Sequence, residues 1–243
     1  MSDKESATKR EQAQRVREMF AAIATRYDLL NHLLSGNVDQ RWRRLVARRM
    51  ASSLPTTNAC VLDVACGTGD LSLALGDGTR AQVVGLDFCR PMLDIAAAKS
   101  SERSLAIPFV EGDALNLPFR DKSFDGVTIA FGLRNLASLE GGLRELRRIL
   151  RPGGTVAVLE FSKPQTPVLR TLFRVYFTKL LPLLGGLISG SKSAYEYLPD
   201  SVSRFPDQAS LAALLKEVGF TEVTFQNLTG GIAALHIGRR PSN

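Results

Sequence analysis

A glycine-rich turn directly follows the first strongly apolar segment of this chain. The turn holds Gly67 and Gly69 in the sequence Cys-Gly-Thr-Gly-Asp, and the preceding residues 61–64 read Val-Leu-Asp-Val. Glycines at the end of a strand let a ligand approach the backbone closely, and open α/β sheets bind their ligands at that edge. A tight turn that only needs small residues explains a lone Gly-x-Gly equally well. The turn by itself therefore supports a binding loop and a purely structural turn in equal measure.

Acidic residues at the ends of the next apolar segments favour the binding loop. Asp87 stands eighteen residues after Gly69, where a carboxylate can accept hydrogen bonds from both hydroxyls of a ribose. Asp113 follows the third segment and can accept a hydrogen bond from an adenine amino group. Together with Asp63 these acids suit a nucleoside without phosphate groups, because a pyrophosphate would be repelled. A dinucleotide fold would also require a third glycine at position 72, which here is Ser72.

The elements that must hold these residues alternate between apolar, β-branched segments and helical segments from residue 60 onward. Such alternation is typical of right-handed crossovers and of a parallel sheet covered by helices on both faces. The fold class is therefore α/β, with a doubly wound, mostly parallel sheet of seven strands. We predict the strands at 60–65, 81–87, 107–111, 124–131, 154–161, 222–228 and 232–238. We predict the accompanying helices at 69–76, 90–99, 139–150 and 207–218.

Further segments lie before and within this sheet. Residues 1–12 are polar and are predicted to form a disordered tail, and residues 13–243 a single domain. The first part of the domain, 13–52, is expected to be a cap with two helices, at 10–26 and 39–51. A helical insertion at 165–205 precedes the last two strands. Those strands read as a hairpin that would add an antiparallel edge strand.

Composition excludes several classes of protein. The chain has 243 residues, of which 44% are hydrophobic and 23% charged, which excludes collagen-like and wholly disordered chains. Three cysteines, Cys60, Cys66 and Cys89, form no Cys-x-x-Cys pair, which argues against both a disulfide framework and a zinc site. The two histidines, His32 and His236, are far apart in the sequence. We therefore expect no metal and a reducing, cytoplasmic location.

The chain is basic, with 31 Lys and Arg against 24 Asp and Glu and a net charge of +7. Such an excess permits a nucleic-acid, anionic-metabolite or membrane partner. Because basic and aromatic residues are scattered, we expect no nucleic acid. Residues 168–184 read as an amphipathic helix that contains Arg170, Arg174 and Lys179 and is too interrupted to span a bilayer. Its apolar stripe suits either the protein core or peripheral docking on the anionic inner face of the cell membrane.

Several motifs resemble those of a known family. They are Tyr27-Asp28-Leu29-Leu30-Asn31 with Trp42, the turn with Asp63, Gly67 and Gly69, Phe131-Gly132-Leu133-Arg134-Asn135, Arg151-Pro152-Gly153-Gly154 and Tyr195-Glu196-Tyr197-Leu198-Pro199-Asp200-Ser201. From about Phe20 to the end, the chain is similar to Rossmann-like class I S-adenosylmethionine-dependent methyltransferases. In finer detail it resembles the quinone-biosynthesis C-methyltransferases, the family of demethylmenaquinone and ubiquinone methyltransferases. Two positions depart from the family pattern: Asp39 replaces the usual histidine three residues before the tryptophan, and Ala130 replaces a serine found in some members.

The resemblance implies a set of residues around the cosubstrate S-adenosylmethionine. These residues are Gly67, Thr68, Gly69, Asp87, Asp113 and Ala114. The spacing of glycines and acids points independently to all of them except Thr68 and Ala114, which rest on the resemblance alone.

The resemblance also implies an acceptor, a prenylated quinol that is methylated on a ring carbon. We predict that Arg134, Asn135 and the phenol of Tyr27 form its polar set, with Arg134 as a fixed cation for the developing phenolate. An Arg-Asn pair that merely caps the loop is the alternative. The expected reaction converts demethylmenaquinol to menaquinol. Its alternatives are C-methylation of the benzoquinol intermediate of ubiquinone, both reactions, or methylation of another lipid. A homodimer is compatible with these residues.

Overall fold

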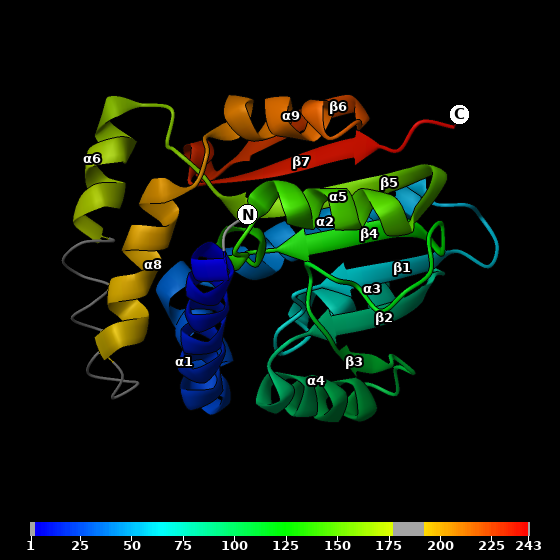
Figure 1. Cartoon of the computed structure of the whole chain (residues 1–243), viewed down its shortest axis with the longest axis horizontal. Helices are drawn as coiled ribbons and strands as arrows, with labels where there is room; N and C mark the ends of the chain where they lie inside the picture. Colours follow the sequence, from blue (N-terminus) through cyan, green and yellow to red (C-terminus); the bar gives the residue numbers. More distant parts are fainter. Residues whose placement is uncertain (1–2, 177–191, 243) are drawn as a thin grey trace.

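A computed structural model describes residues 3–176 and 192–242 of the chain. Seven strands form one sheet in the order β3-β2-β1-β4-β5-β7-β6 (Figure 1). They are β1 (Cys60–Val64), β2 (Gln82–Asp87), β3 (Phe109–Glu111), β4 (Phe124–Ala130), β5 (Leu150–Phe161), β6 (Thr221–Leu228) and β7 (Ala233–Arg239). Strands β1 to β5 pair in parallel, whereas β7 is antiparallel to both of its neighbours. The predicted doubly wound, mostly parallel sheet of seven strands is confirmed.

The closing hairpin differs from the prediction in the place of its antiparallel strand. Strand β7 lies inside the sheet, between β5 and β6, and β6 forms the edge. Because β6 is antiparallel to β7, it runs in the same direction as β1 to β5. Burial explains the order: the first four residues of β7 are buried, whereas β6 is exposed along most of its length. A strand that is apolar on both faces gains more from an interior position than a half-polar one does.

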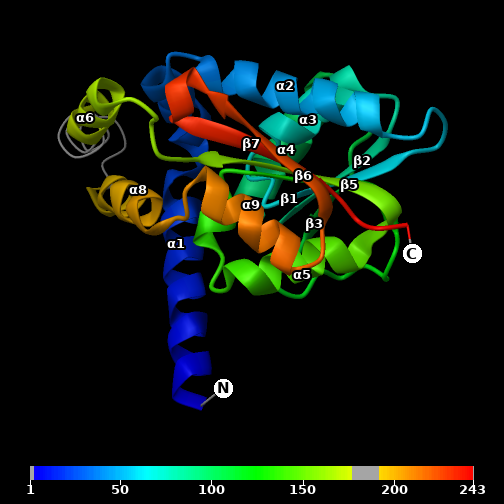
Figure 2. The same ribbon diagram turned by 90° about the horizontal axis from the view of Figure 1, so that it is seen from above.

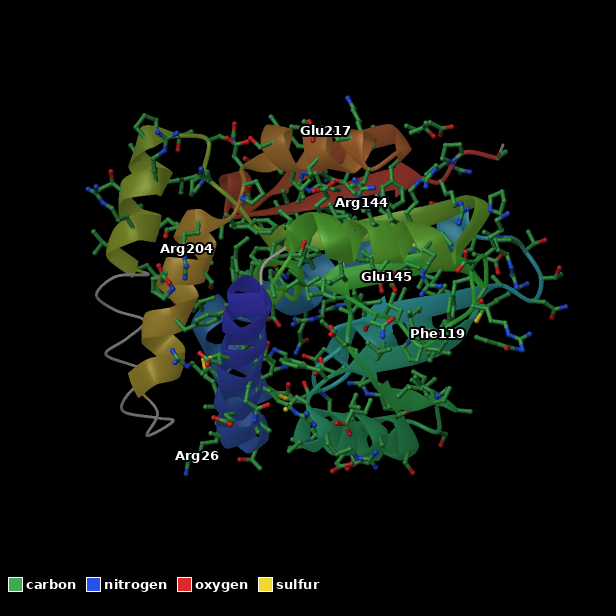
Figure 3. The ribbon with its side chains drawn as sticks, in the orientation of Figure 1. Arg26, Phe119, Arg144, Glu145, Arg204 and Glu217 are labelled. Atoms are coloured by element: carbon green, nitrogen blue, oxygen red, sulfur yellow. The ribbon has the colours of Figure 1, made fainter. Side chains whose placement is uncertain are left out.

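Helices cover both faces of the sheet (Figure 2). One face carries α2 (Val38–Ser53), α3 (Asp70–Gly78) and α4 (Arg90–Glu102), and the other carries α5 (Leu139–Ile149) and α9 (Gln208–Glu217). Helix α5 shows the reason for this packing, because Leu143, Leu146 and Ile149 are fully buried on one side and its charged side chains, such as Arg144, lie outside (Figure 3). An apolar stripe at helical spacing buries itself against the sheet.

The chain order reverses between β1 and β4, which are neighbours in the sheet. The carboxyl ends of these strands point toward α1 (Asp3–Ser35), a long helix that stands across that edge of the sheet (Figure 1). In open α/β sheets, ligands bind at such a point. Helix α1 thus stands where a bound ligand would be covered.

The start of the chain differs from the disordered tail that was predicted for residues 1–12. Helix α1 begins at Asp3, so residues 3–12 continue the helix instead of forming a disordered tail. This stretch consists mainly of Glu, Lys, Arg, Gln, Ala and Ser. Most of these residues favour helix, and a helix already started by packed residues extends at little cost. Residues 36 and 37 separate α1 from α2.

The insertion before the last strands contains α6 (Pro167–Val175) and α8 (Lys192–Arg204). Helix α6 covers the first part of the predicted helix 168–184, and residues 177–184 lie outside the described residues. Helix α8 lies within the predicted helical insertion 165–205, although no separate helix was predicted there, and it contains Pro199, a residue that normally interrupts a helix. No helix in the described ranges is both long and apolar enough to cross a membrane.

Candidate cofactor and acceptor site

A cavity of about 490 Å³ lies at the carboxyl ends of β1, β2 and β4. Its floor is the glycine-rich turn after β1, and one side of α1 closes it from above with Gln14, Arg17, Phe20 and Tyr27. From one of these residues to the next the spacing is three, three and seven positions, which places them on one side of the helix. The cavity lies within the roughly 300–1,000 Å³ range of small-molecule sites.

Glycines with positive φ angles and close packing determine the shape of this turn and of the end of β4. Gly69 has a φ of 83°, and a Cβ on it would lie 2.9 Å from the Cβ of Ala96. At the end of β4, a Cβ on Gly132 would lie 2.5 Å from the Cβ of Ala65. Ala65 and Phe131 both adopt left-handed conformations, with φ of 52° and 57°. Backbone strain of this kind collects at functional sites, and here it shapes the two strand ends that border the cavity.

Asp63 braces the turn from below. Its Oδ1 accepts a hydrogen bond from the Thr128 hydroxyl at 2.8 Å, and its Oδ2 accepts one from the Ser72 hydroxyl at 2.6 Å. Burial raises the pKa of Asp63 to about 6. Since protein hydroxyls occupy both carboxylate oxygens, Asp63 orients the turn. Ser72, at the position where a dinucleotide fold needs glycine, is one of the two braces.

Asp87 links the end of β2 to the glycine turn. Its Oδ2 accepts from the Gly67 amide at 2.8 Å, and its Oδ1 accepts from the Cys89 amide at 2.9 Å. Burial raises the pKa of Asp87 to about 6. The side chain borders the cavity, so its remaining lone pairs are available to hydroxyl donors of a ligand.

Asp113 and Ala114 border the same cavity beyond β3. The Asp113 Oδ1 accepts from the Leu115 amide at 2.8 Å, which fixes the loop, and the residue is exposed. Ala114 is buried. Gly67, Thr68, Asp87, Asp113 and Ala114 therefore lie around one cavity, as predicted. Gly69 is set back from it against α4 and serves the shape of the turn.

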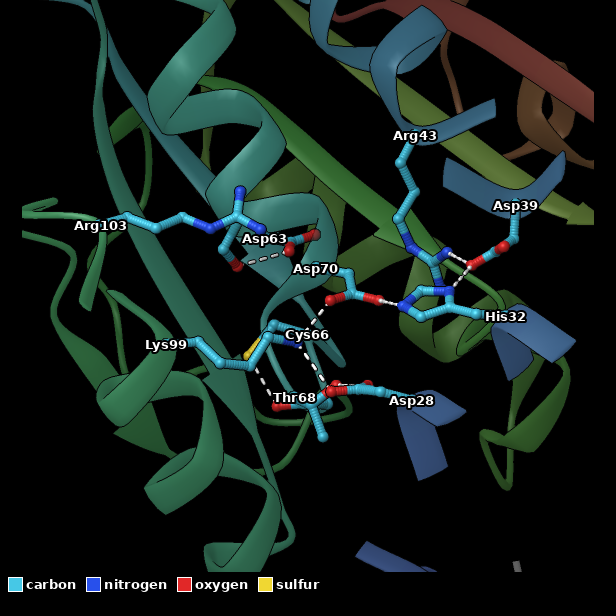
Figure 4. A network of polar contacts seen from close by, with 12 residues as sticks. Asp28, His32, Asp39, Arg43, Asp63, Cys66, Thr68, Asp70, Lys99 and Arg103 are labelled. Carbon is cyan, nitrogen blue, oxygen red and sulfur yellow. Dashed lines mark hydrogen bonds and ion pairs between the residues drawn. The ribbon is translucent and has the colours of Figure 1, made fainter. Parts of the chain in front are cut away.

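Thr68 connects the turn to α1. Its hydroxyl donates to Oδ1 of Asp28 at 2.5 Å, and Lys99 donates to Oδ2 of Asp28 at 2.9 Å (Figure 4). Lys99 also pairs with Asp70, the first residue of α3. Asp28 did not emerge as a site residue from the sequence, although it lies in the Tyr27-Asp28 motif. Through Asp28, the helix that covers the cavity holds the turn that forms its floor.

Arg134 differs from its predicted arrangement. Its guanidinium pairs with Glu160 at 2.6 Å and donates to the Phe131 carbonyl at 2.6 Å, and both charged side chains are almost fully buried. Arg134 is not one of the described residues that line the cavity. The sequence could not reveal this, because Glu160 lies 26 positions away on β5. The charge of Arg134 is therefore balanced behind the cavity wall instead of facing the acceptor.

Tyr27 and Asn135 do border the cavity, as predicted. The Asn135 Oδ1 accepts from the hydroxyl of Tyr197 on α8 at 3.0 Å. Burial raises the pKa of Tyr27, although the charges of Arg134 and Arg43 oppose this. Tyr27 thus keeps its proton at neutral pH and can act as a hydrogen-bond donor.

A network of charged side chains continues from the cavity to a second one of about 430 Å³. Arg43 pairs with Asp39, whose Oδ2 lies 3.0 Å from Nδ1 of His32 (Figure 4). The other ring nitrogen of His32 lies 3.5 Å from Asp70. This imidazole and the two carboxylates come within 4.8 Å of one another, but Arg43 and Lys99 already neutralise the carboxylates. We therefore assign no metal to them.

A family model and individual relatives of known name all match this chain over most of its length. The model of the ubiE/COQ5 methyltransferase family matches residues 8–240. A demethylmenaquinone methyltransferase of Thermus thermophilus is 51% identical over 92% of this chain and 100% of its own length. The ubiquinone/menaquinone biosynthesis C-methyltransferase UbiE of a Geobacter species is 43% identical over 95% of this chain and 98% of its own.

Among solved structures, the [4+2]-cyclase SpnF has the same fold. It superposes with a TM-score of 0.71 at 18% identity, over 95% of this chain and 97% of that one. This fold places the cavity at the strand ends of a Rossmann-like sheet, and the family match covers the motifs that border it. The chain belongs to the ubiE/COQ5 methyltransferase family.

Proposed function

We propose that this protein methylates a ring carbon of a prenylated quinol, converting demethylmenaquinol to menaquinol with S-adenosylmethionine as methyl donor. The observation that carries the proposal is a single cavity with two kinds of wall. Asp87, Asp113 and the glycine turn form a wall suited to a nucleoside, and aromatic residues with Tyr27 and Asn135 form the other. The names of the relatives from Thermus and Geobacter support the acceptor.

The residues present fit this cosubstrate. A Cβ on Gly67 would meet no atom within 4 Å, so the turn leaves open space beside its backbone. Asp87 would hold the ribose hydroxyls, and Asp113 with Ala114 the adenine. When bound, the cosubstrate supplies a methyl group on a positively charged sulfur. The carboxylates of Asp63, Asp87 and Asp113 in the cavity wall suit a ligand with such a positive charge.

The protein promotes the reaction of the acceptor by hydrogen bonding to it and by holding its ring next to the methyl donor. A ring carbon next to a hydroxyl becomes nucleophilic as that hydroxyl gives up its proton to water. After methyl transfer the ring carbon loses its hydrogen as a proton and the oxygen regains one, so that one proton is released to water in total. The neutral phenol of Tyr27 donates a hydrogen bond to the oxygen as negative charge develops on it, which lowers the barrier. Asn135, fixed by Tyr197, orients the ring, and Arg134 acts through the Phe131 carbonyl that it holds. Placement of two reactants at short distance supplies much of the rate.

Purified protein with labelled cosubstrate tests this function. We expect label to enter reduced demethylmenaquinone and to be lost when Tyr27→Phe removes the phenol hydroxyl. The benzoquinol precursor of ubiquinone is the second acceptor to measure, because the Geobacter relative carries both quinones in its name. Labelling of neither quinol by protein that binds the cosubstrate would reject the proposed acceptor.

We further propose that α6 docks on the anionic membrane that holds the prenyl chain. Val168, Leu172 and Val175 recur at intervals of four and three residues, and they are exposed by 71%, 60% and 46%. Arg170 is exposed on the same helix. An apolar face with basic neighbours binds anionic lipid surfaces.

Vesicle flotation tests this docking. The native chain is expected to float with vesicles containing phosphatidylglycerol and to be released by salt, because the charge attraction is screened. A variant with Val168→Ser and Leu172→Ser should remain with the soluble fraction. Phe225→Ser, on the exposed edge strand β6, is the matched control and should float normally. Equal flotation of both variants would contradict docking through α6.

A further inference from the structure

Arg43 is a buried cation beside the cavity for which sequence reasoning found no role. It lies on α2, and its side chain is only 10% exposed. It borders both the main cavity and the second one. Its guanidinium carbon lies 5.5 Å from the ring centroid of Phe131, at the end of β4. A buried arginine normally has its hydrogen-bond donors paired, so any donor of Arg43 without a protein partner indicates where a ligand group could bind.

The hydrogen bonds of Arg43 leave part of the guanidinium unused. Nη1 donates to Asp39. Within the described parts of the chain, Nε and Nη2 make no hydrogen bond, and neither is among the fully enclosed atoms that lack a partner. These donors are therefore accessible from the cavities that the side chain lines. A guanidinium presents its donors in a planar fork that matches a carboxylate.

The order of the strand ends indicates which part of a ligand reaches Arg43. Asp113 follows β3 and Asp87 ends β2, and both belong to the proposed nucleoside side. The next strands across the sheet are β1 and β4, and Arg43 stands over Phe131 at the end of β4. A ligand with its adenine near β3 and its ribose near β2 extends its remaining part toward β1 and β4. In S-adenosylmethionine, that part is an amino acid with a carboxylate.

We propose that Arg43 binds the amino-acid carboxylate of the cosubstrate. This inference rests on the proposed use of S-adenosylmethionine and adds a binding residue to it. The acidic strand ends hold the nucleoside, and the buried guanidinium of Arg43 binds the opposite, negatively charged end. The ligand is thereby fixed at both ends, with its sulfur between them.

The surroundings of Arg43 hold its fork in place. The Oδ2 atom of Asp39 accepts a hydrogen bond from Arg43 and also contacts Nδ1 of His32. Its Oδ1 atom accepts a hydrogen bond from the Ser35 hydroxyl at 2.6 Å. Burial acts to raise the pKa of Asp39, but Arg43, Ser35 and His32 together lower it below its ordinary value. Asp39 therefore stays ionised and positions Arg43 through one nitrogen. The acidic residue that departs from the family pattern has a function in this network.

Two ligands that differ in the amino-acid end test the anchor. S-adenosylhomocysteine has the carboxylate, whereas 5′-methylthioadenosine keeps the adenosine and the sulfur and lacks it. In Arg43→Met, calorimetry should show the affinity for S-adenosylhomocysteine reduced about 10- to 100-fold, as expected for a lost charge-assisted hydrogen bond. The affinity for 5′-methylthioadenosine should stay within about two-fold of the native value.

The neighbouring Arg44 provides the control. Arg44 is exposed on the same helix and does not border the main cavity, so Arg44→Met should bind both ligands normally. Arg43→Lys keeps the charge and should retain part of the preference for S-adenosylhomocysteine, and it serves if Arg43→Met does not fold. An unchanged affinity for S-adenosylhomocysteine, or an equal loss for both ligands, would overturn the proposal. Failure of the native protein to bind S-adenosylhomocysteine would instead reject the proposed cosubstrate.

Discussion

Replacing Arg134 with methionine is expected to lower the free energy of unfolding by about 3–5 kcal/mol. The substitution removes the cation from an ion pair whose side chains are 6% and 1% exposed. Glu160 would then be a buried carboxylate without its countercharge. Urea unfolding at neutral pH measures the loss. Arg144→Met is the matched control, because its partner Glu140 is exposed, and exposed pairs contribute only about 0–1 kcal/mol.

The pH dependence of this loss has a definite sign. Burial already raises the pKa of Glu160 above the ordinary value of 4.5, and removal of Arg134 raises it further. A carboxyl whose pKa is raised in the folded state favours folding when protonated, so the deficit of the variant should shrink as the pH falls. A deficit that is equal at neutral and acidic pH would contradict the ionised state of Glu160.

A double variant separates stability from chemistry at this position. Arg134→Met with Glu160→Leu removes both charges and should regain most of the lost stability, because no buried charge is left unpaired. If this folded variant binds the cosubstrate and also methylates quinol, Arg134 is structural. If it binds the cosubstrate and is inactive, Arg134 contributes to the acceptor side through the Phe131 carbonyl.

Asp87→Asn is expected to weaken cosubstrate binding about 10- to 100-fold, since charge-assisted hydrogen bonds contribute about 1.5–3 kcal/mol each. The carboxylate oxygens of Asp87 face two backbone donors, the amides of Gly67 and Cys89. An asparagine would turn its own NH₂ group toward one of them. The glycine turn would then lose a hydrogen bond in addition to the contact with the ribose.

The native protein should also bind the cosubstrate less well at acidic pH. The pKa of Asp87 is about 6 in the free protein, with both amide hydrogen bonds already made, and hydrogen bonds from the ribose hydroxyls would lower it on binding. Binding therefore releases a proton, and affinity should fall as the pH drops below about 6. Calorimetry with S-adenosylhomocysteine between acidic and neutral pH measures this slope. Asp94→Asn, an exposed residue of α4, should keep the slope, and a slope that also persists in Asp87→Asn would exclude Asp87 as its origin.

The sequence predicted the strand ends of the fold well because local signals determine them. Val61, Leu62 and Val64 are apolar on both faces and fully buried, so a continuous apolar segment followed by Gly67 was sufficient to place both strand and turn. Asp87 follows an equivalent segment. The direction and place of β6 and β7 depended instead on burial within the assembled sheet, which no local pattern reports.

The polar contacts behind the cavity could not be read from the sequence. Glu160 meets Arg134 across 26 positions, and Asp28 meets Thr68 across 40. Residue types and spacing therefore suggested a free cation at Arg134 where the structure has a balanced pair. The same limitation hid Arg43, which resembles any other arginine of α2 until its burial against Phe131 is known.

The two walls of the cavity have separate structural origins. The nucleoside wall comes from the ends of sheet strands, whereas Tyr27 comes from α1 and the residue that fixes Asn135 comes from α8. The sheet is shared with a cyclase at only 18% identity. Because the two walls come from different elements, changes in α1 or α8 would alter the acceptor wall while leaving the strand ends in place.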